Sequence, residues 1–158
     1  MPSANSDTTA LAADVERLWT MLFQLVLDAE KHIAGQLAQH GLTTPQFYVL
    51  KTLIEHGGSC PIGEIAHLHG LTNPTMTGLV GRMEASDPPL VTRIKHLEDK
   101  RSVNVVLTDA GRERFLAVQQ RLFEQLRHLF SLLDSETRAS LMAELDRYID
   151  VIRSAIAQ

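Results

Sequence analysis

Apolar positions recur at helical spacing in several separate stretches of the chain. From Leu11 to about Gln39 they fall at intervals of three and four, which predicts one long amphipathic helix. Gly41 follows as a typical helix-ending residue. A second helix is expected to open just after Thr43, which can cap it while Gln46 reaches back to the cap. The first third of the chain is therefore predicted to be two helices joined by a tight turn.

Two shorter helices follow, with a glycine between them. An apolar pattern after Pro61 predicts a short third helix, which Gly70 ends. Thr72 can cap a fourth helix, and Pro74 fits its first turn. Two helices separated by a tight glycine-containing turn are typical of a helix-turn-helix. The positions with core spacing on the fourth helix are Met76, Leu79, Val80 and Met83.

Two strands and two long helices complete the pattern. Residues 90–94 and 103–107 are predicted to form a hairpin, because apolar and other residues alternate along the second of them. Thr108 can cap a fifth helix that runs to about Leu133, and Asp134 with Ser135 opens a sixth. The expected fold is mainly α with a small β-hairpin wing, a winged helix-turn-helix.

The terminal helices have more apolar surface than a small winged domain can cover. An amphipathic helix must bury its stripe against something, and a second copy of the chain is the simplest partner. Residues 11–40 and 115–158 are therefore predicted to be the dimerisation helices of a homodimer, around a DNA-binding domain at 41–114. The small and polar residues 1–10 are expected to be a disordered lead-in.

Composition places the chain among ordinary globular proteins, with 158 residues, 44% hydrophobic and 22% charged. A single cysteine excludes an internal disulfide, and no apolar run reaches the roughly 20 residues of a membrane span. Cytoplasmic residence and no membrane partner are the expectation. The net charge of −4 argues against nucleic-acid binding, but residues 72–114 carry seven Lys/Arg against six Asp/Glu. Positive charge is thus concentrated in the segment that contains the fourth helix and the hairpin.

The fourth helix and the hairpin contain the residue types that read DNA. Hydroxyl and amide side chains near a helix N-terminus can bond phosphates or base edges, and glycine lets a backbone approach closely. The predicted reading residues on the helix are Thr72, Asn73, Thr75, Thr77, Gly78 and Arg82. Those of the wing are Arg93, Lys95, Asp99, Lys100 and Arg101. Taken singly, each piece also fits an ordinary solvated surface, whereas the combination favours duplex DNA as partner.

Five motifs in this stretch resemble the MarR family of transcriptional regulators. They are Leu42-Thr43-x-x-Gln46-Phe47-x-x-Leu50, Ile62-x-Glu64-Ile65-Ala66, Leu71-Thr72-x-Pro74-Thr75-Met76-Thr77, Asp99-Lys100-Arg101-Ser102 and Leu107-Thr108-x-x-Gly111-Arg112. The resemblance implies a dimeric winged-helix regulator, usually a repressor that a small, often aromatic, ligand releases from a pseudo-palindromic operator. It also implies a recognition helix at 72–84 and a minor-groove contact by Arg101. The chain departs from the family by inserting Ala85-Ser86-Asp87-Pro88-Pro89 where a glycine usually precedes the wing strand.

Several side chains suggest a ligand-binding site. Those that could line a pocket for a small aromatic effector are Trp19, Phe23, His32, Phe47 and Tyr48, although most are more simply core. Cys60 is expected to be buried or in a loop without a sensing role. None of the seven histidines forms a cluster with metal-ligand spacing, so neither a metal site nor a cofactor is predicted. His67 and His69 are expected at the surface, near the phosphate backbone.

Three alternatives to a DNA-binding regulator remain. The acidic net charge suits a winged-helix module that binds protein instead of DNA. A second alternative is a redox-sensing regulator in which Cys60 is the reactive thiol. An enzyme finds little support, because the sequence has no glycine-rich phosphate loop, nucleophile elbow or His-Glu-x-x-His motif. Some methyltransferases carry a similar dimerising domain, but no Rossmann-like segment follows in this sequence.

Overall fold

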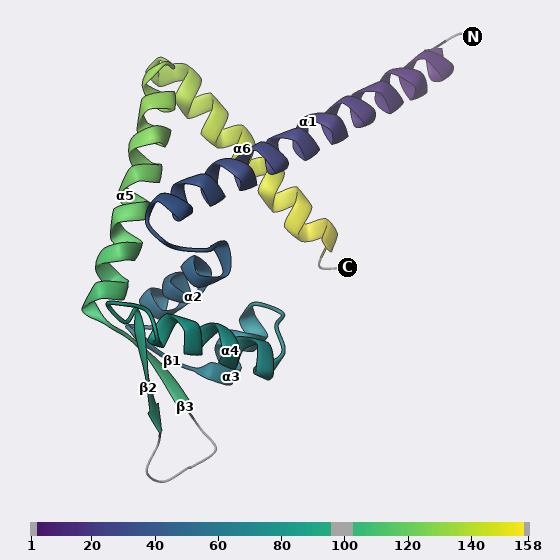
Figure 1. The fold of residues 1–158 in the computed structure, drawn as a ribbon. Coiled ribbons are helices and arrows are strands. Elements are labelled where there is room, and N and C mark those ends of the chain that lie inside the picture. The colour runs from purple at the N-terminus through teal and green to yellow at the C-terminus, as the bar shows by residue number, and fades with distance from the viewer. Residues whose placement is uncertain (1–2, 96–102, 157–158) are drawn as a thin grey trace. The chain divides into compact units, whose positions relative to one another are not determined.

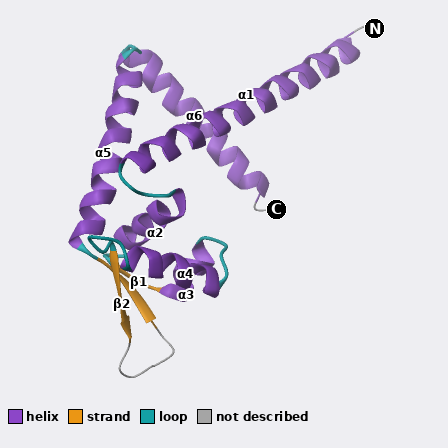
Figure 2. Cartoon of the chain, viewed as in Figure 1, coloured by secondary structure: helices purple, strands orange, loops and turns teal. Residues whose placement is uncertain are grey.

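The chain is mainly helical, with one small sheet. We describe a computed structural model that covers residues 3–95 and 103–156 (Figures 1 and 2). It divides into two compact units, residues 1–118 and 119–158. The elements are α1 (Ser3–Gln39), α2 (Thr44–Glu55), β1 (Ser59–Pro61), α3 (Ile62–Leu68), α4 (Asn73–Glu84), β2 (Val91–Lys95), β3 (Val103–Leu107), α5 (Asp109–Ser131) and α6 (Ser135–Ile156). This arrangement confirms the predicted winged helix-turn-helix with long helices at both ends.

The sheet has three antiparallel strands in the order β1-β3-β2, where the sequence predicted two. In the hairpin Arg93 lies opposite Val105, and on the other side of β3 Cys60 is the partner of Val105. β1 escaped prediction because three residues are too few for an alternating pattern to be recognised. It gives the hairpin an inner edge, so the wing is joined to the helix-turn-helix by backbone hydrogen bonds.

The core of the first unit lies where α2, α3 and α4 pack against the sheet. Leu50, Ile65, Met76 and Val105 are fully buried and come from these four parts. All four residues predicted to have core spacing on α4 are buried, which confirms that face of the helix. In Figure 1 the β2–β3 hairpin extends away from these helices. Packing on one side of α4 leaves its other side free for a partner.

The first helix begins at Ser3, whereas the sequence predicted a disordered lead-in over residues 1–10. Extending an existing helix costs little, since only the first turn must be nucleated. The stripe that starts at Leu11 supplies that nucleus, and the preceding small residues continue it. The expected lead-in is corrected accordingly for residues 3–10.

Tight turns occur where the glycines predicted them. Gly41 and Gly70 have φ angles of 66° and 60°, a region that other residues rarely adopt. At the start of α2 the Thr43 N–H donates to Gln46 Oε1 at 2.8 Å, as expected for the predicted cap. These turns set the directions in which α2 and α4 begin.

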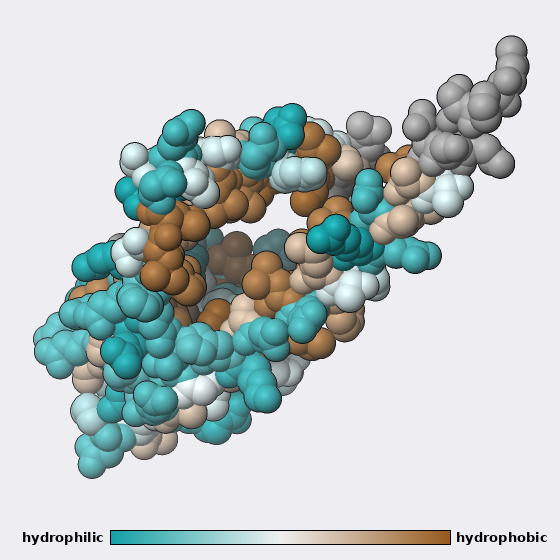
Figure 3. Space-filling model, turned by 90° about the horizontal axis from the view of Figure 1, so that it is seen from above, coloured by the Kyte–Doolittle hydropathy of each residue, from teal (hydrophilic) through white to brown (hydrophobic). Residues whose placement is uncertain are grey.

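Much of the surface of the long helices is apolar. Residues on this exposed surface of α1 include Leu11, Val15, Leu18, Trp19, Leu22, Phe23 and Val26, and those on α6 include Leu141, Leu145, Tyr148, Ile149 and Ile152. Figure 3, which shows one face of the molecule, has brown apolar residues along these helices. Within the described part of the chain no helix has the length and hydropathy that a membrane span requires.

Candidate nucleic-acid interface

The outer face of α4 is polar and open. All six predicted reading residues are exposed, from Thr72 at the cap to Arg82 near the end of the helix. Thr72 accepts a hydrogen bond from the Thr75 backbone N–H at 3.4 Å, and the two hydroxyls are 2.8 Å apart. The Thr75 hydroxyl therefore takes part in the cap, whereas Thr77, one turn along from Asn73, faces outward. Together they give α4 a face of hydroxyls, an amide and one cation.

Gly78 creates a gap in the middle of this face. A Cβ built on Gly78 would lie 3.7 Å from Arg82 Nη1, so the guanidinium folds back along the helix toward it. Nothing in the described chain comes within 4 Å of a Cβ on Gly81. The protein's own packing therefore requires neither glycine, although each lowers helix stability by up to about 1 kcal/mol. Contacts within the described chain therefore give no reason for either glycine.

The wing strand β2 is fastened to the end of α4. Arg93 Nε donates to Glu84 Oε2 at 2.8 Å, and the Arg93 backbone N–H donates to Glu84 Oε1 at 3.1 Å. Hydrogen bonding from the Arg93 side chain, together with its charge, holds the pKa of the Glu84 carboxyl below its ordinary value. Arg93 was predicted as a DNA contact, and its guanidinium pairs with Glu84 while 37% of the side chain stays exposed. The pair links β2 to the end of α4, and a contact of Arg93 with DNA stays a prediction.

Of the other predicted wing residues, one is exposed and three lie outside the described part of the chain. Lys95, at the end of β2, is exposed. Asp99, Lys100 and Arg101 lie outside the described residues, so their roles stay predictions. The base of the hairpin is closed by Thr108, whose hydroxyl donates to the Pro89 carbonyl at 2.7 Å and accepts from the Gly111 N–H at 3.0 Å. The predicted cap of α5 thus also fixes where β2 begins.

Comparison with known proteins agrees with this geometry. Residues 42–103 match the MarR family profile. The HTH-type transcriptional regulator YsmB of Bacillus subtilis is 31% identical over 124 residues, which cover 78% of this chain and 81% of YsmB. The chain belongs to the MarR family. It is accordingly a DNA-binding transcriptional regulator and not an enzyme.

Two further MarR-type comparisons bear on repression and DNA. The homoprotocatechuate degradative operon repressor of Escherichia coli is 27% identical over 111 residues, 70% of this chain and 73% of the repressor. A structure of an S. aureus MepR mutant bound to an oligodeoxyribonucleotide superposes with a TM-score of 0.64 at 25% identity, covering 85% of this chain and 97% of that chain. Similar proteins thus include a named repressor and a protein seen with DNA.

Two hollows in this MarR-family chain meet at Tyr48. One, of about 710 Å³, lies between α1 and α2 and includes Leu27, Lys31 and Thr44. The other, of about 230 Å³, lies beneath α4 and includes His69 and Met76. Of the five residues predicted for an effector pocket, only Tyr48 lines either hollow.

The other predicted pocket residues lie elsewhere. Trp19 and Phe23 are exposed on α1, with ring centroids 5.6 Å apart, and are not core residues. His32 is exposed on α1. Phe47 stacks on Phe115 at 4.9 Å. Helical spacing placed these residues on or next to the apolar face of their helices. It could not show which of them line a hollow.

His69 is half-buried, which corrects the expected position at the surface. Its Nε2 lies 2.9 Å from the Thr52 hydroxyl, and its ring stacks on Tyr48 with centroids 6.2 Å apart. Burial, and secondarily the charge of Lys51, lowers the pKa of His69 from 6.5. His67, two residues earlier, is exposed as predicted. His69 thus packs against Thr52 and Tyr48 beneath α4, and its expected place near a phosphate backbone stays a prediction.

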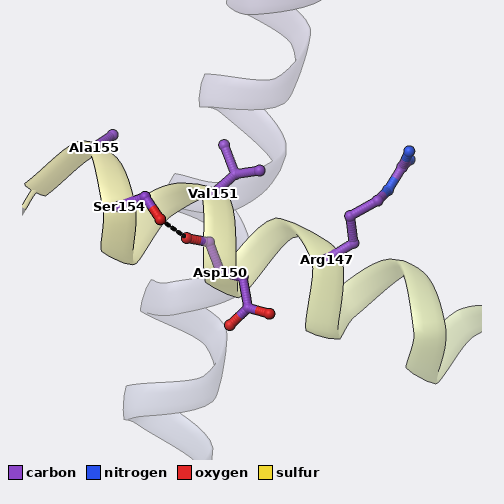
Figure 4. A pocket seen from close by; sticks show the side chains of 5 residues that line it. All are labelled: Arg147, Asp150, Val151, Ser154 and Ala155. Carbon is purple, nitrogen blue, oxygen red and sulfur yellow. Dashed lines mark hydrogen bonds between the residues drawn. The ribbon is translucent and has the colours of Figure 1, made fainter.

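A shallow hollow on α6 is a poor candidate for a ligand. Figure 4 shows its residues, Arg147, Asp150, Val151, Ser154 and Ala155, which all come from this one helix. The Ser154 hydroxyl is already satisfied, because it donates to the Asp150 carbonyl at 2.8 Å. Among the residues that the structure describes, no second element contributes a side chain to this hollow, so these residues alone form no enclosed site.

Cys60 is fully buried in β1, in agreement with the expectation. Burial raises the pKa of its thiol. The negative charge of Glu64, which also accepts a hydrogen bond from the thiol, raises that pKa further. A thiol that keeps its proton is a poor nucleophile toward peroxides. This setting argues against the redox-sensing alternative. The structure also brings His56 close to Cys60 and Glu64, a grouping that the sequence analysis missed because it considered the histidines alone.

Proposed function

We propose that this MarR-family regulator is a repressor that binds a pseudo-palindromic operator as a homodimer and is released by a small aromatic ligand. The observation that carries the proposal is the exposed polar face of α4 beside the wing. Its core side is fully packed, and its outer side presents Asn73, Thr77 and Arg82. Such side chains bond base edges and phosphates in a major groove. The wing would add a minor-groove contact through Arg101.

The exposed apolar surface of the long helices supports the dimer. Monomers rarely expose apolar patches larger than a few hundred Å². Here large apolar side chains remain exposed along α1, α5 and α6, for example Leu22, Phe123 and Leu145 at about half of their full area. A second copy that covered them would also supply a second recognition helix. Two such helices address half-sites about 34 Å apart, one turn of DNA.

The hollows around Tyr48 support the ligand response. The smaller hollow is lined by Val49, Leu71, Met76 and Leu79, with Tyr48 and His69 as polar groups. A mostly apolar lining with a few polar groups suits a small aromatic molecule. Because Met76 and Leu79 form the inner face of α4, a ligand there would press directly on the recognition helix.

The first experiment compares binding to the DNA upstream of the protein's own gene with binding to a random duplex, across a salt series. A specific complex that survives moderate salt is expected. Phenolic acids such as homoprotocatechuate, chosen from the relative's name, are then added to look for release. If neither duplex is bound at low salt, the protein-interaction alternative replaces DNA binding.

Two substitutions separate base reading from phosphate contact. Thr77→Ala is expected to reduce the preference for the operator over random DNA, by about 1–3 kcal/mol if a base contact is lost. Thr77 is a better probe than Thr75, whose hydroxyl also supports the helix cap. Arg101→Ala is expected to weaken both complexes and to flatten the salt dependence by about one unit of slope. Equal weakening of both duplexes by Thr77→Ala would contradict the recognition-helix assignment.

A further inference from the structure

Three metal-binding side chains converge beside the sheet, outside the DNA-reading face. His56 ends α2, Cys60 is the middle residue of β1, and Glu64 lies in the first turn of α3. One donor atom from each lies within 4.8 Å of the other two, and His56 Nε2 is 3.8 Å from Glu64 Oε1. Among the residues that the structure describes, this is the only such grouping of three.

The local chain path produces this convergence. After α2 the backbone reverses through Gly57 and Gly58, with φ angles of 71° and 98°, and the Gly58 N–H donates back to the Leu53 carbonyl at 2.7 Å. β1 then pairs with β3, which fixes Cys60 opposite Val105. The three donors are four residues apart in sequence, yet they come from three elements. They are therefore held by separate parts of the fold.

The ring of His56 is already oriented for coordination. Its Nδ1 lies 2.8 Å from the Thr52 carbonyl oxygen, which can only accept a hydrogen bond. Nδ1 must therefore carry the hydrogen, and the neutral ring has its lone pair on Nε2, the atom nearer Glu64. Histidines that bind metals usually have this arrangement, with the other nitrogen bonded to a carbonyl or carboxylate.

The three donor residues differ in how far they are buried. Cys60 is inaccessible to solvent, whereas the side chains of His56 and Glu64 are 36% and 50% exposed. A cation arriving from solvent would therefore meet His56 and Glu64 first, with the Cys60 sulfur behind them. As an ion pair alone, His56 and Glu64 would contribute little to stability at this exposure.

We propose that His56, Cys60 and Glu64 form a binding site for a borderline divalent cation such as Zn²⁺, with water as fourth ligand. Sulfur, imidazole nitrogen and carboxylate oxygen are the ligands that Zn²⁺ takes in proteins. On binding, the thiol gives its proton to solvent and a sulfur–metal bond forms, with no change of oxidation state. Tetrahedral ligands stand about 3.3–3.8 Å apart. The 3.8 Å between His56 Nε2 and Glu64 Oε1 already falls at the end of this range, and the other donor separations, within 4.8 Å, would have to close by about 1 Å on binding.

The test uses the full chain without a histidine tag. Co²⁺ serves as a spectroscopic probe, and Zn²⁺ is titrated in competition with a chromophoric chelator. The expected results are one Co²⁺ per chain, a sulfur-to-cobalt charge-transfer band, and displacement of Co²⁺ by Zn²⁺. A complex without that band would mean that Cys60 is not a ligand and would overturn the proposal, as would an absence of binding.

Variants at the two exposed donors decide which residues bind. Glu64→Gln and His56→Gln are each expected to weaken Zn²⁺ binding at least about tenfold, since loss of even an outer partner of a ligand costs that much. Cys60→Ser is expected to remove the charge-transfer band, and the exposed-site variants keep the test valid if this buried substitution impairs folding.

Two matched controls exclude adventitious surface binding. His67→Gln changes an exposed histidine on α3, and Glu55→Gln changes a carboxylate whose partner is Lys51. Both are expected to bind Zn²⁺ as the unmodified chain does. If His67→Gln weakened binding as much as His56→Gln, the site would be elsewhere.

Discussion

At the scale of single residues, Gly111 determines how α5 leaves the wing. A Cβ at this position would collide with the carbonyl oxygen of Leu90 and lie 3.0 Å from Leu107 Cδ1. That carbonyl also accepts the Thr108 N–H at 3.2 Å, so it cannot move away freely. The glycine of the Leu-Thr-x-x-Gly motif is therefore a requirement of close packing between a helix and the start of a strand.

Gly111→Ala is expected to destabilise the chain by about 1–3 kcal/mol, the usual cost of overpacking, because backbone must shift to admit the methyl group. The measurement is the midpoint of denaturant unfolding at unchanged m-value. Gly35→Ala is the control, since a Cβ added at Gly35 would have no neighbouring atom within 4 Å. It should raise stability by up to about 1 kcal/mol. A Gly111→Ala variant as stable as the unmodified chain would show that the contact relaxes without cost.

His69 is expected to make stability depend on pH. The pKa of His69 is lower in the folded chain than in the unfolded chain, where it is near 6.5. Just below pH 6.5 the unfolded chain therefore binds a proton at His69 more readily than the folded chain does. The contribution is fully present above that pH and is lost as the pH falls below it, by at most about 1.4 kcal/mol per pH unit. In urea unfolding at several pH values, His69→Gln should reduce this slope. The exposed His67→Gln should leave it, and equal slopes in all three proteins would contradict the assignment.

At the scale of elements, α4 combines a well-packed inner face with an outer face that weakens the helix. Met76, Val80 and Met83 are fully buried, whereas Gly78 and Gly81 remove side chains that would favour the helix. The Arg93–Glu84 contact then joins this helix to β2. The end of α4 and the start of the wing are thus joined by side-chain and backbone hydrogen bonds.

Gly78→Ala is expected to stabilise the folded chain by up to about 1 kcal/mol and to weaken operator binding at the same time. The added methyl group fits the protein, where its nearest neighbour is 3.7 Å away, but it occupies the space left for a DNA backbone. Thermal unfolding and a DNA titration measure the two effects. Gly35→Ala, far from the reading face in sequence, should change stability alone. Unchanged DNA affinity in Gly78→Ala would remove the close-approach explanation.

At the scale of the whole molecule, exposed apolar surface is the feature that a single chain leaves unexplained. Leu22 on α1 and Leu145 on α6 are 47% and 45% exposed, and both belong to continuous helical stripes. A charge placed in such a stripe would have to be buried unpaired in a dimer, which is strongly unfavourable. The two stripes therefore allow a direct test of self-association.

Leu22→Glu and Leu145→Glu are each expected to shift the protein from twice 17.6 kDa to 17.6 kDa in sedimentation equilibrium. Loss of tight operator binding should accompany the shift, since a monomer presents one recognition helix. Leu68→Glu is the matched control, because Leu68 is 53% exposed but lies on α3. If the unmodified chain sediments as a monomer at micromolar concentration, the dimer proposal fails.

The sequence by itself determined the helices, the caps and the family. Periodic apolar positions, Thr43, Thr72 and Thr108 at caps, and Gly41 and Gly70 at helix ends are local signals, and each acts through neighbours a few residues away. For the same reason the buried and exposed faces of α4 were predicted correctly. The motifs around residues 42–112 identified the MarR family because they combine several of these local signals.

Tertiary structure alone decided which distant residues meet. β1 exists because β3 offers it an edge, and Arg93 pairs with Glu84 because the wing folds back on α4. His56 and Cys60 come together through the turn between α2 and β1. Neither periodicity nor spacing encodes such contacts, since they depend on how elements pack. Whether a side chain borders a hollow, as Tyr48 does, is likewise a property of the packed chain.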